Sequence, residues 1–316
     1  MKSKIPLIAI IGPTAVGKTA TSLALVEELG GEIISVDSRQ VYRLLDIGTD
    51  KVPPHVRKKI PHHLIDIVYP DEIYSAADFA NDAKKAINLI RSRGKTPLLI
   101  GGSPMYYAAL FGSLHEDLPK DEEIRRELEE RIAKDGLATL HRELEEIDPV
   151  SASRIHEHDP VRTMRALEVY KITGKPLSWH YENQQRPENP YSVQFIGLLR
   201  DRSTLYENIS RRVREQFATG YVEEVDFLLK NGYSPNLPSL QGFGYKEIVE
   251  YLEGKRSLWS AIEGDIRATK AFSRRQMTWF KHFEPCQWFN LDKTPQEEVI
   301  AQAIRLSNEF LEKAGD

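Results

Sequence analysis

The chain has a single cysteine, Cys286, and no apolar run long enough to span a bilayer. One cysteine cannot form a disulfide within the chain, which fits a reducing compartment, and we assign Cys286 no role. A membrane-spanning helix needs about 18 consecutive apolar residues. The N-terminus, MKSKIPLIAIIGPT, lacks a small-residue cleavage site, so we expect a buried strand there and not a signal peptide. These absences predict a soluble, cytoplasmic protein without membrane association.

Charge is segregated along the chain. The net charge of −4 argues weakly against a nucleic-acid binder, but an average conceals local patches. From Glu116 to Asp148 acidic residues outnumber basic ones about two to one. The stretch from Ile266 to Phe283 contains no acidic residue, and its basic residues are Arg267, Lys270, Arg274, Arg275 and Lys281.

Short apolar runs separated by helical segments predict an α/β fold. Four runs have the length of buried parallel strands: Leu7–Ile11, Glu32–Val36, His63–Val68 and Pro97–Ile100. Helical patterns over Thr19–Leu29 and Ser75–Arg93 lie between them, as in a doubly wound parallel sheet flanked by helices. A fifth run, Val193–Leu199, follows a long interruption, and we expect the chain beyond Leu199 to be helical.

The interruption, from about Leu114 to Pro190, has only helical patterns. A charged helix follows Pro119 and ends at Gly136, a second continues to Ile147, and another covers Val161–Thr173. We therefore expect a catalytic core made of residues 1–113 and 191–316, with an all-helical insertion domain at 114–190.

A phosphate-binding loop follows the first predicted strand. The sequence GPTAVGKT matches G-x-x-x-x-G-K-[ST], with an apolar strand before it and a helix after it. Glycines let backbone N–H groups surround phosphate oxygens, Lys18 adds a positive charge, and the Thr19 hydroxyl can bind Mg²⁺. The predicted phosphate-binding residues are Gly12, Pro13, Thr14, Ala15, Val16, Gly17, Lys18 and Thr19. The motif predicts a P-loop NTPase-like core, but it does not specify the reaction.

Polar residues follow the second predicted strand. Ligands of open α/β sheets bind at the carboxyl ends of the strands, so Asp37 should face the phosphate loop. There its carboxylate could act as a base or reach Mg²⁺ through water. An isolated Asp after a strand is often a helix N-cap, but a cap does not explain why Arg39 and Gln40 follow immediately.

The chain resembles the short bacterial tRNA dimethylallyltransferases (tRNA isopentenyltransferases). The resemblance covers nearly the whole chain in one order. The matching segments are GPTAVGKT at 12–19, DSRQVYRLLDIGTDK at 37–51, PHHLIDI at 61–67, GGSPMYYAAL at 101–110, DPVRTMRALEVYKITGKPLS at 159–178, GFGYKEIVEYLEG at 242–254 and TKAFSRRQMTWFKHF at 269–283.

The resemblance implies that a dimethylallyl group passes from dimethylallyl pyrophosphate to N6 of adenosine 37, beside the tRNA anticodon, with Mg²⁺ as cofactor. The implied partners are the anticodon stem-loop and the donor, and we expect a monomer. By this resemblance Asp37 takes the proton from the adenine amine, while Lys18 and Thr19 act on the diphosphate with Thr14. Arg212 matches an arginine that helps hold the diphosphate, although Arg211 and Arg214 are its neighbours.

The resemblance also implies a surface that contacts tRNA. The residues that match it are Asp37, Ser38, Arg39, Gln40, Ser103, Val161, Arg162, Thr163, Met164 and Arg165. Ser103 stands where the family usually has Thr, and Val161 where Gln is frequent. The acid-free stretch 269–283 mixes basic and aromatic residues, which suits either an RNA-facing helix or an amphipathic helix with buried rings. For His62 and His63 we expect a structural role.

Three other functions share parts of this pattern. A small-molecule or nucleotide kinase shares the core and loop, but it does not require the DSRQVY cluster. An adenylate isopentenyltransferase makes the same bond on a free nucleotide, although the insertion and the arginines of RTMR favour tRNA. A P-loop protein that binds RNA and uses nucleotide as a switch would not need a base beside the phosphate loop.

Overall fold

The computed structural model describes residues 4–112, 118–183 and 188–315. They form two compact units, which we call the core unit (Met1–Phe111 with Asn189–Asp316) and the helical unit (Gly112–Glu188). The predicted boundary at 113/114 falls in residues 113–117, which lie outside the described ranges, and the one at 190/191 lies two residues beyond the change of unit at 188/189. The division at 113/114 and 190/191 therefore stays a prediction.

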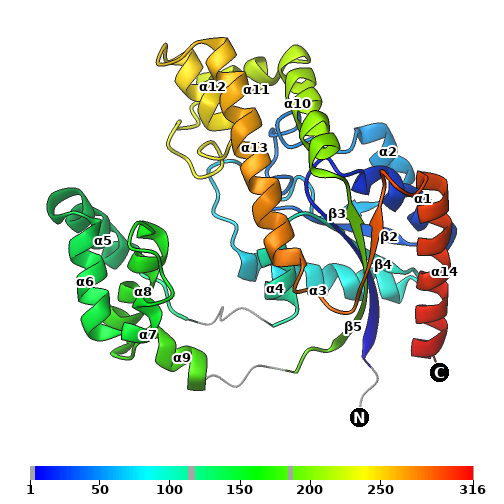
Figure 1. The fold of residues 1–316 in the computed structure, drawn as a ribbon, viewed down its shortest axis with the longest axis horizontal. Helices are drawn as coiled ribbons and strands as arrows, with labels where there is room; N and C mark the ends of the chain where they lie inside the picture. Colours follow the sequence, from blue (N-terminus) through cyan, green and yellow to red (C-terminus); the bar gives the residue numbers. More distant parts are fainter. Residues whose placement is uncertain (1–3, 113–117, 184–187, 316) are drawn as a thin grey trace. The chain divides into compact units, whose positions relative to one another are not determined.

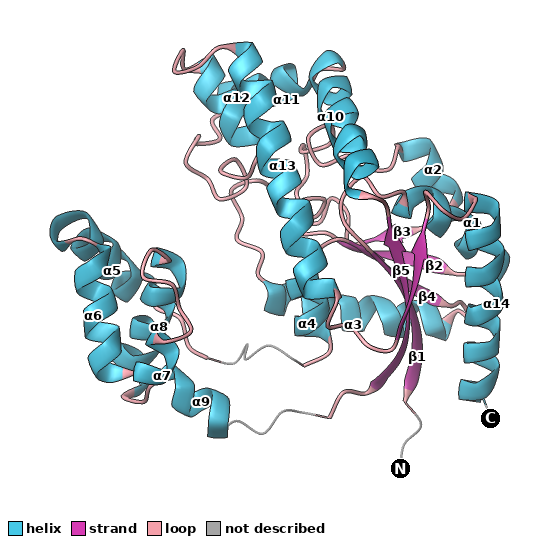
Figure 2. Cartoon of the chain, in the orientation of Figure 1, coloured by secondary structure: helices cyan, strands magenta, loops and turns pink. Residues whose placement is uncertain are grey.

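The core unit is built on a six-stranded parallel sheet with the order β3-β2-β4-β1-β5-β6 (Figure 2). The strands are β1 (Ile5–Ile11), β2 (Glu32–Val36), β3 (His62–His63), β4 (Pro97–Gly101), β5 (Tyr191–Leu199) and β6 (Cys286–Asn290). The first strand therefore lies inside the sheet, between β4 and β5. The carboxyl ends of β1, β2 and β4 lie close together at one edge.

Helices cover both faces of this sheet, which is why its central strands are apolar on both sides (Figure 1). Leu7, Ala9 and Ile11 pack into one hydrophobic cluster, and Ile8 and Ile10 pack into the other. The first cluster includes side chains of α3 (Ala76–Ser92), α4 (Pro104–Leu110), α11 (Tyr221–Lys230), α12 (Tyr245–Leu252) and α13 (Leu258–Phe280). The second includes side chains of α1 (Lys18–Leu29), α10 (Arg202–Ala218) and α14 (Gln296–Gly315).

Two strand predictions were wrong. The run 63–68 was expected to be one strand, but only His62–His63 pairs with β2. Leu64 and Asp66 have φ angles of 63° and 58°, which are incompatible with a strand, and the segment instead pairs with the loop after β2 at Tyr42 and Val68. The expectation that the chain is only helical beyond Leu199 missed β6, and the short helix α2 (Pro54–Lys59) was not predicted.

The helical unit has a hydrophobic core of its own. Its elements are α5 (Glu122–Asp135), α6 (Leu137–Ile147), α7 (Pro149–Ala152), α8 (Pro160–Thr173) and α9 (Leu177–Asn183). Leu128, Leu140 and Leu144 are fully buried in it. Glu168 is also fully buried, and its carboxylate forms ion pairs with Arg125 and Arg165. Within the ranges that the structure describes, this unit is entirely helical.

Candidate active site

The phosphate loop connects β1 to α1 in a shape that requires glycine. Gly12 has a φ of 147°, and a Cβ added there would lie 2.6 Å from the backbone oxygen of Leu198 in β5. Gly17, which precedes the first helical residue, has a φ of 116°. A side chain at either position would strain the backbone, so the two glycines allow the loop to curl around the N-terminus of α1. That terminus presents free N–H groups and the positive end of the helix dipole, which together favour an anion.

Lys18 reaches back over this loop. Its Nζ donates hydrogen bonds to the backbone oxygens of Gly12 (2.9 Å) and Pro13 (2.8 Å). Desolvation lowers the pKa of Lys18 to about 8, while the negative charge of Asp37 raises it and the positive charge of Arg212 lowers it further. A phosphate bound in the loop would therefore compete with these two carbonyl oxygens for the Lys18 ammonium group.

Asp37 follows β2 and shares the pocket with the phosphate loop. Its Oδ1 accepts hydrogen bonds from the backbone N–H groups of Arg39 (2.8 Å) and Gln40 (3.3 Å). The side chain thus bonds to the following amides as a helix N-cap would, but the residues after Asp37 form a turn and no helix begins here. Both hydrogen bonds to the Asp37 carboxylate from the described residues end on Oδ1, and none of these residues donates to Oδ2.

Arg212 reaches the phosphate loop from α10. Its Nη2 donates to the Thr14 hydroxyl over 2.8 Å, and its Nη1 forms an ion pair of 3.2 Å with Asp50. The two neighbouring arginines have other partners: Arg211 bonds to Asn208, and Arg214 pairs with Glu263. Of the three arginines, Arg212 is the one that contacts the phosphate loop, although Arg211 also lines the pocket.

Gln276 is a site residue that the sequence reasoning missed. It lies on α13 and is buried. Its Oε1 accepts from the backbone N–H of Thr14 (2.9 Å), and its Nε2 donates to the backbone oxygen of Gly102 (2.6 Å). Gln276 thus ties the phosphate loop to the end of β4. It lies within the segment 269–283, where the sequence drew attention to basic and aromatic residues only.

These residues line one pocket of about 840 Å³. Its walls are the phosphate loop, the segments after β2 and β4, and side chains of α10 and α13. The predicted residues that line it are Thr14, Ala15, Val16, Gly17, Lys18, Thr19, Asp37, Ser38, Arg39, Gln40, Ser103 and Arg212. This volume is within the range of small-molecule binding sites.

The residues of the core unit that were predicted to contact tRNA form hydrogen bonds with other residues of this unit. Ser103 accepts a hydrogen bond of 3.0 Å from the Ser38 backbone N–H and joins the ends of β4 and β2. Arg39 donates to the backbone oxygen of Ser239 and stacks on Tyr245, with its guanidinium carbon 5.1 Å from the ring centre. Gln40 accepts from the Ser35 hydroxyl (3.0 Å), so these contacts shape the pocket wall.

The predicted contact residues of the helical unit differ in accessibility. Val161 and Arg162, in the first turn of α8, are exposed. Thr163 is fully buried, and Met164 packs against the core of the unit. Arg165 is held by an ion pair to Glu168 and by hydrogen bonds to backbone oxygens 118 and 119. Of the five predicted residues, only Val161 and Arg162 present exposed side chains.

The segment 269–283 has buried rings on one side and basic groups on the other, and whether it faces RNA stays a prediction. Phe280 is fully buried, and Phe283 packs against it with a ring separation of 5.4 Å. On the other side of α13, Lys270 lies over the ring of Tyr206 and Arg274 donates to its hydroxyl. The rings of Phe280 and Phe283 thus belong to the core, whereas Trp279 is exposed and Phe272 lines the pocket together with Arg275.

A family model described as IPP transferase matches residues 40–283, which is more than half of the chain. The chain belongs to the IPP transferase family. Its relatives include the tRNA dimethylallyltransferase of Geobacter sulfurreducens, 44% identical over 286 residues (90% of this chain and 92% of that one). The tRNA dimethylallyltransferase of Thermotoga neapolitana is 45% identical over 293 residues, covering 92% of this chain and 95% of that one.

Solved structures of IPP transferases agree with this assignment. The tRNA isopentenylpyrophosphate transferase of Bacillus halodurans superposes with a TM-score of 0.73 at 38% identity, over 99% of both chains. A eukaryotic dimethylallyltransferase, described as acting on tRNA, superposes with a TM-score of 0.81 at 27% identity, over 98% of this chain and 80% of that one. No helix among the described residues is long and apolar enough to cross a membrane.

Proposed function

We propose that the chain transfers a dimethylallyl group from dimethylallyl pyrophosphate to N6 of adenosine 37 in tRNA and releases pyrophosphate. The relatives named above are tRNA dimethylallyltransferases that match nearly the full chain. The observation that carries the proposal is that the phosphate loop and Asp37 line the same pocket. Such a pocket can hold a diphosphate leaving group and accept a proton from a nucleophile in the same complex.

The donor diphosphate binds to the phosphate loop in this proposal. The backbone N–H groups at the start of α1, the Lys18 ammonium and the Arg212 guanidinium surround the space that its oxygens would occupy. As the bond between C1 of the dimethylallyl group and oxygen breaks, the electron pair and the negative charge move onto the pyrophosphate. Fixed donors aimed at this charge stabilise the transition state more than the ground state.

The residues present fit a Mg²⁺ ion that is held largely by the substrate. Among the residues that the structure describes, no group of three or more His, Cys, Asp or Glu side chains could hold a metal. The exposed Thr19 hydroxyl lines the pocket at the phosphate loop, and Mg²⁺ commonly binds phosphate oxygens, water and one or two protein oxygens. The ion would neutralise charge on the departing pyrophosphate.

Asp37 acts on the acceptor. The exocyclic amine of adenine is a weak nucleophile, because its lone pair is delocalised into the ring. As the bond between N6 and C1 forms, Oδ2 of Asp37 takes the N6 proton, while Oδ1 stays bonded to the Arg39 and Gln40 amides. Adenosine 37 must leave its stack to reach this carboxylate. We infer that the exposed Val161 and Arg162 of the helical unit contact the anticodon arm.

Competition between pyrophosphate and the donor tests the proposal. If the loop binds the diphosphate, inorganic pyrophosphate should inhibit prenyl transfer competitively with dimethylallyl pyrophosphate, because the amides and Lys18 recognise phosphate oxygens whatever they carry. A parallel reaction with ATP and tRNA should release little phosphate. Rapid ATP turnover without prenylated adenosine would return the chain to the kinases, and prenylation of free AMP but not of tRNA would favour the adenylate enzyme.

A further inference from the structure

The segment from Gln40 to Lys51 forms part of the pocket rim without a helix or strand of its own. Gly48, Thr49 and Asp50 line the pocket, and the whole segment consists of turns with a single bridge at Tyr42. Leu44 and Asp50 both adopt positive φ angles, of 67° and 55°. Such a backbone keeps one shape only when surrounding groups hold it.

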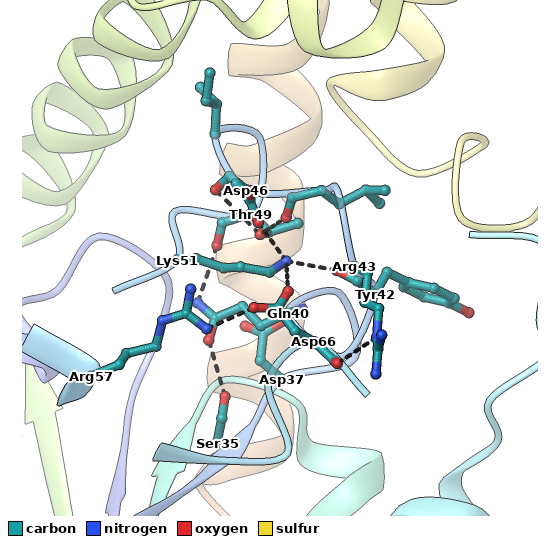
Figure 3. Close-up of polar contacts among 12 residues, drawn as sticks. Ser35, Asp37, Gln40, Tyr42, Arg43, Asp46, Thr49, Lys51, Arg57 and Asp66 are labelled. Carbon is teal, nitrogen blue, oxygen red and sulfur yellow. Dashed lines mark hydrogen bonds and ion pairs between the residues drawn. The ribbon is translucent and has the colours of Figure 1, made fainter. Parts of the chain in front are cut away.

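Lys51 supplies one such anchor (Figure 3). Its Nζ donates to the backbone oxygen of Tyr42 (2.6 Å), to Oδ1 of Asp46 (2.7 Å) and to Oδ1 of Asp66 (2.5 Å). All three of its protons are therefore used, and its side chain is only 3% exposed. One ammonium group thus joins the beginning, middle and end of the segment to a neighbouring part of the chain.

Asp66, which bonds to Lys51, is itself held by two arginines. Its second carboxylate oxygen bonds to Arg57 over 2.6 Å, and its backbone oxygen accepts a hydrogen bond from Nε of Arg43 (Figure 3). Burial raises the pKa of Asp66, but the hydrogen bonds and charges of Lys51 and Arg57 outweigh it and lower the pKa overall. The carboxylate consequently stays charged at neutral pH and keeps Lys51 in place.

Glu224 holds the same segment from α11. Its Oε2 accepts from the backbone N–H groups of Asp46 (2.8 Å) and Ile47 (2.6 Å), and its Oε1 accepts from that of Gly48 (3.2 Å). The Tyr245 hydroxyl donates to Oε1 over 2.7 Å and fixes the carboxylate. One side chain thus satisfies three successive amides, as an anion bound in a backbone turn would.

The far end of the segment meets the residues at the pocket. Nε2 of Gln40 donates to the backbone oxygens of Thr49 (3.1 Å) and Asp50 (3.4 Å), and Gln40 is held in turn by Ser35 below it. The backbone N–H of Gln40 also bonds to Asp37. If residues 46–51 moved, Gln40 would therefore move with them and would shift the neighbouring Asp37, the proposed proton acceptor.

We propose that Lys51, Asp66 and Glu224 are positioning residues that hold the acceptor side of the pocket in its reactive geometry. None of the three is among the described residues that line the pocket, so each acts through the segment it holds. In the proposed reaction the loop 12–19 and Arg212 hold the phosphate groups of the donor. Arg212 meets the segment through its ion pair with the exposed Asp50, but its bond to Thr14 holds it on the loop independently. Loss of these anchors should therefore impair use of the acceptor more than binding of the donor. The inference rests on the proposed prenyl transfer.

Steady-state kinetics of Lys51→Met and Glu224→Gln test it, with Lys85→Met as the matched control. Lys85 is a surface lysine on α3 that is 78% exposed, and among the described residues it pairs only with Asp82. An anticodon stem-loop RNA and dimethylallyl pyrophosphate are each varied at saturating concentration of the other. We expect kcat/KM for the RNA to fall on the order of 10–100-fold in both variants, as for a misplaced reacting group, while the KM of the donor changes less than about threefold. The Lys85→Met variant should equal the wild type.

The double variant Lys51→Met, Glu224→Gln adds a second readout. Because both side chains hold one segment, the combined loss in kcat/KM should be smaller than the product of the two single losses. If Lys51→Met does not fold, Asp66→Asn retains Lys51 with two of its acceptors and should show the same selective loss. Equal losses toward both substrates, with both KM values unchanged and the folded fraction measured by circular dichroism lower by the same factor, would mean less folded enzyme and would overturn the inference. A wild-type protein without prenyl transfer would instead refute the proposed function.

Discussion

Substitution of Asp37 by asparagine removes the expected proton acceptor but preserves the turn that positions it. Oδ1 of Asp37 accepts from the Arg39 and Gln40 amides, and an asparagine oxygen can accept the same two bonds. The Asp37→Ala variant loses both the base and the turn. Comparison of the two variants therefore separates the chemistry of the carboxylate from its structural role.

The expected magnitudes differ for activity and stability. Loss of a general base lowers the rate by about 10²–10⁴, or roughly 3–5 kcal/mol in the activation free energy. This loss should be common to both variants. The alanine variant should in addition lose about 1–2 kcal/mol of stability, because two half-buried amides lose their acceptor. For a unit of this size the Tm then falls by roughly 2–8 °C, whereas that of the asparagine variant should stay close to the wild type.

Single-turnover prenyl transfer, with product detected by mass, measures the rate directly, and thermal unfolding measures the Tm. Binding of an anticodon stem-loop RNA should stay nearly unchanged in the asparagine variant, because the pocket wall keeps its shape. An Asp37→Asn enzyme that retains more than about a third of the wild-type rate would remove Asp37 from the mechanism.

Three further predictions concern Lys18 and Gln276 in the pocket and Arg162 in the helical unit. Desolvation lowers the pKa of Lys18 to about 8, so its charge is lost as the pH rises through that value. The affinity for pyrophosphate should then fall relative to that of Lys18→Arg between about pH 7 and 9.5, and calorimetric titrations with a constant ratio would contradict this. Gln276→Leu leaves two backbone groups without their hydrogen-bond partner, which costs about 1–3 kcal/mol each. Both the Tm and the donor affinity should therefore fall, and unchanged values of both would refute the bridging role of Gln276. Arg162→Ala should reduce the salt slope of tRNA binding by roughly 0.7–0.9, while Arg126→Ala, equally exposed in the helical unit, should not. Equal slopes for wild type and Arg162→Ala would mean that Arg162 contacts no phosphate.

Arg165 shows why the structure changes the choice of variant. From the sequence, Arg162 and Arg165 were equivalent candidates for phosphate contacts. In the structure Arg165 pairs with the buried Glu168 and bonds to two backbone oxygens, so its loss would damage the helical unit itself. Only Arg162 can be replaced without that confounding effect.

The sequence by itself determined those features whose conformation depends on residues next to one another along the chain. The glycines and Lys18 of GPTAVGKT, between an apolar run and a helix, predicted the phosphate loop, because its backbone conformation is a local property. The apolar runs of β1, β2, β4 and β5 predicted a parallel sheet for the same reason. The ordered set of motifs predicted the family that the comparisons show.

The tertiary structure alone decided which distant residues meet at the pocket and at the segment beside it. Gln276 and Thr14 are 262 residues apart, and Glu224 and Asp46 are 178 apart, so no local pattern pairs them. Positive φ angles at Leu64 and Asp66 end β3 early, although the run around them is apolar, because the segment pairs with the loop after β2 instead. Hydrogen bonds between remote segments depend on how the sheet and helices pack, and that packing is a property of the whole core unit.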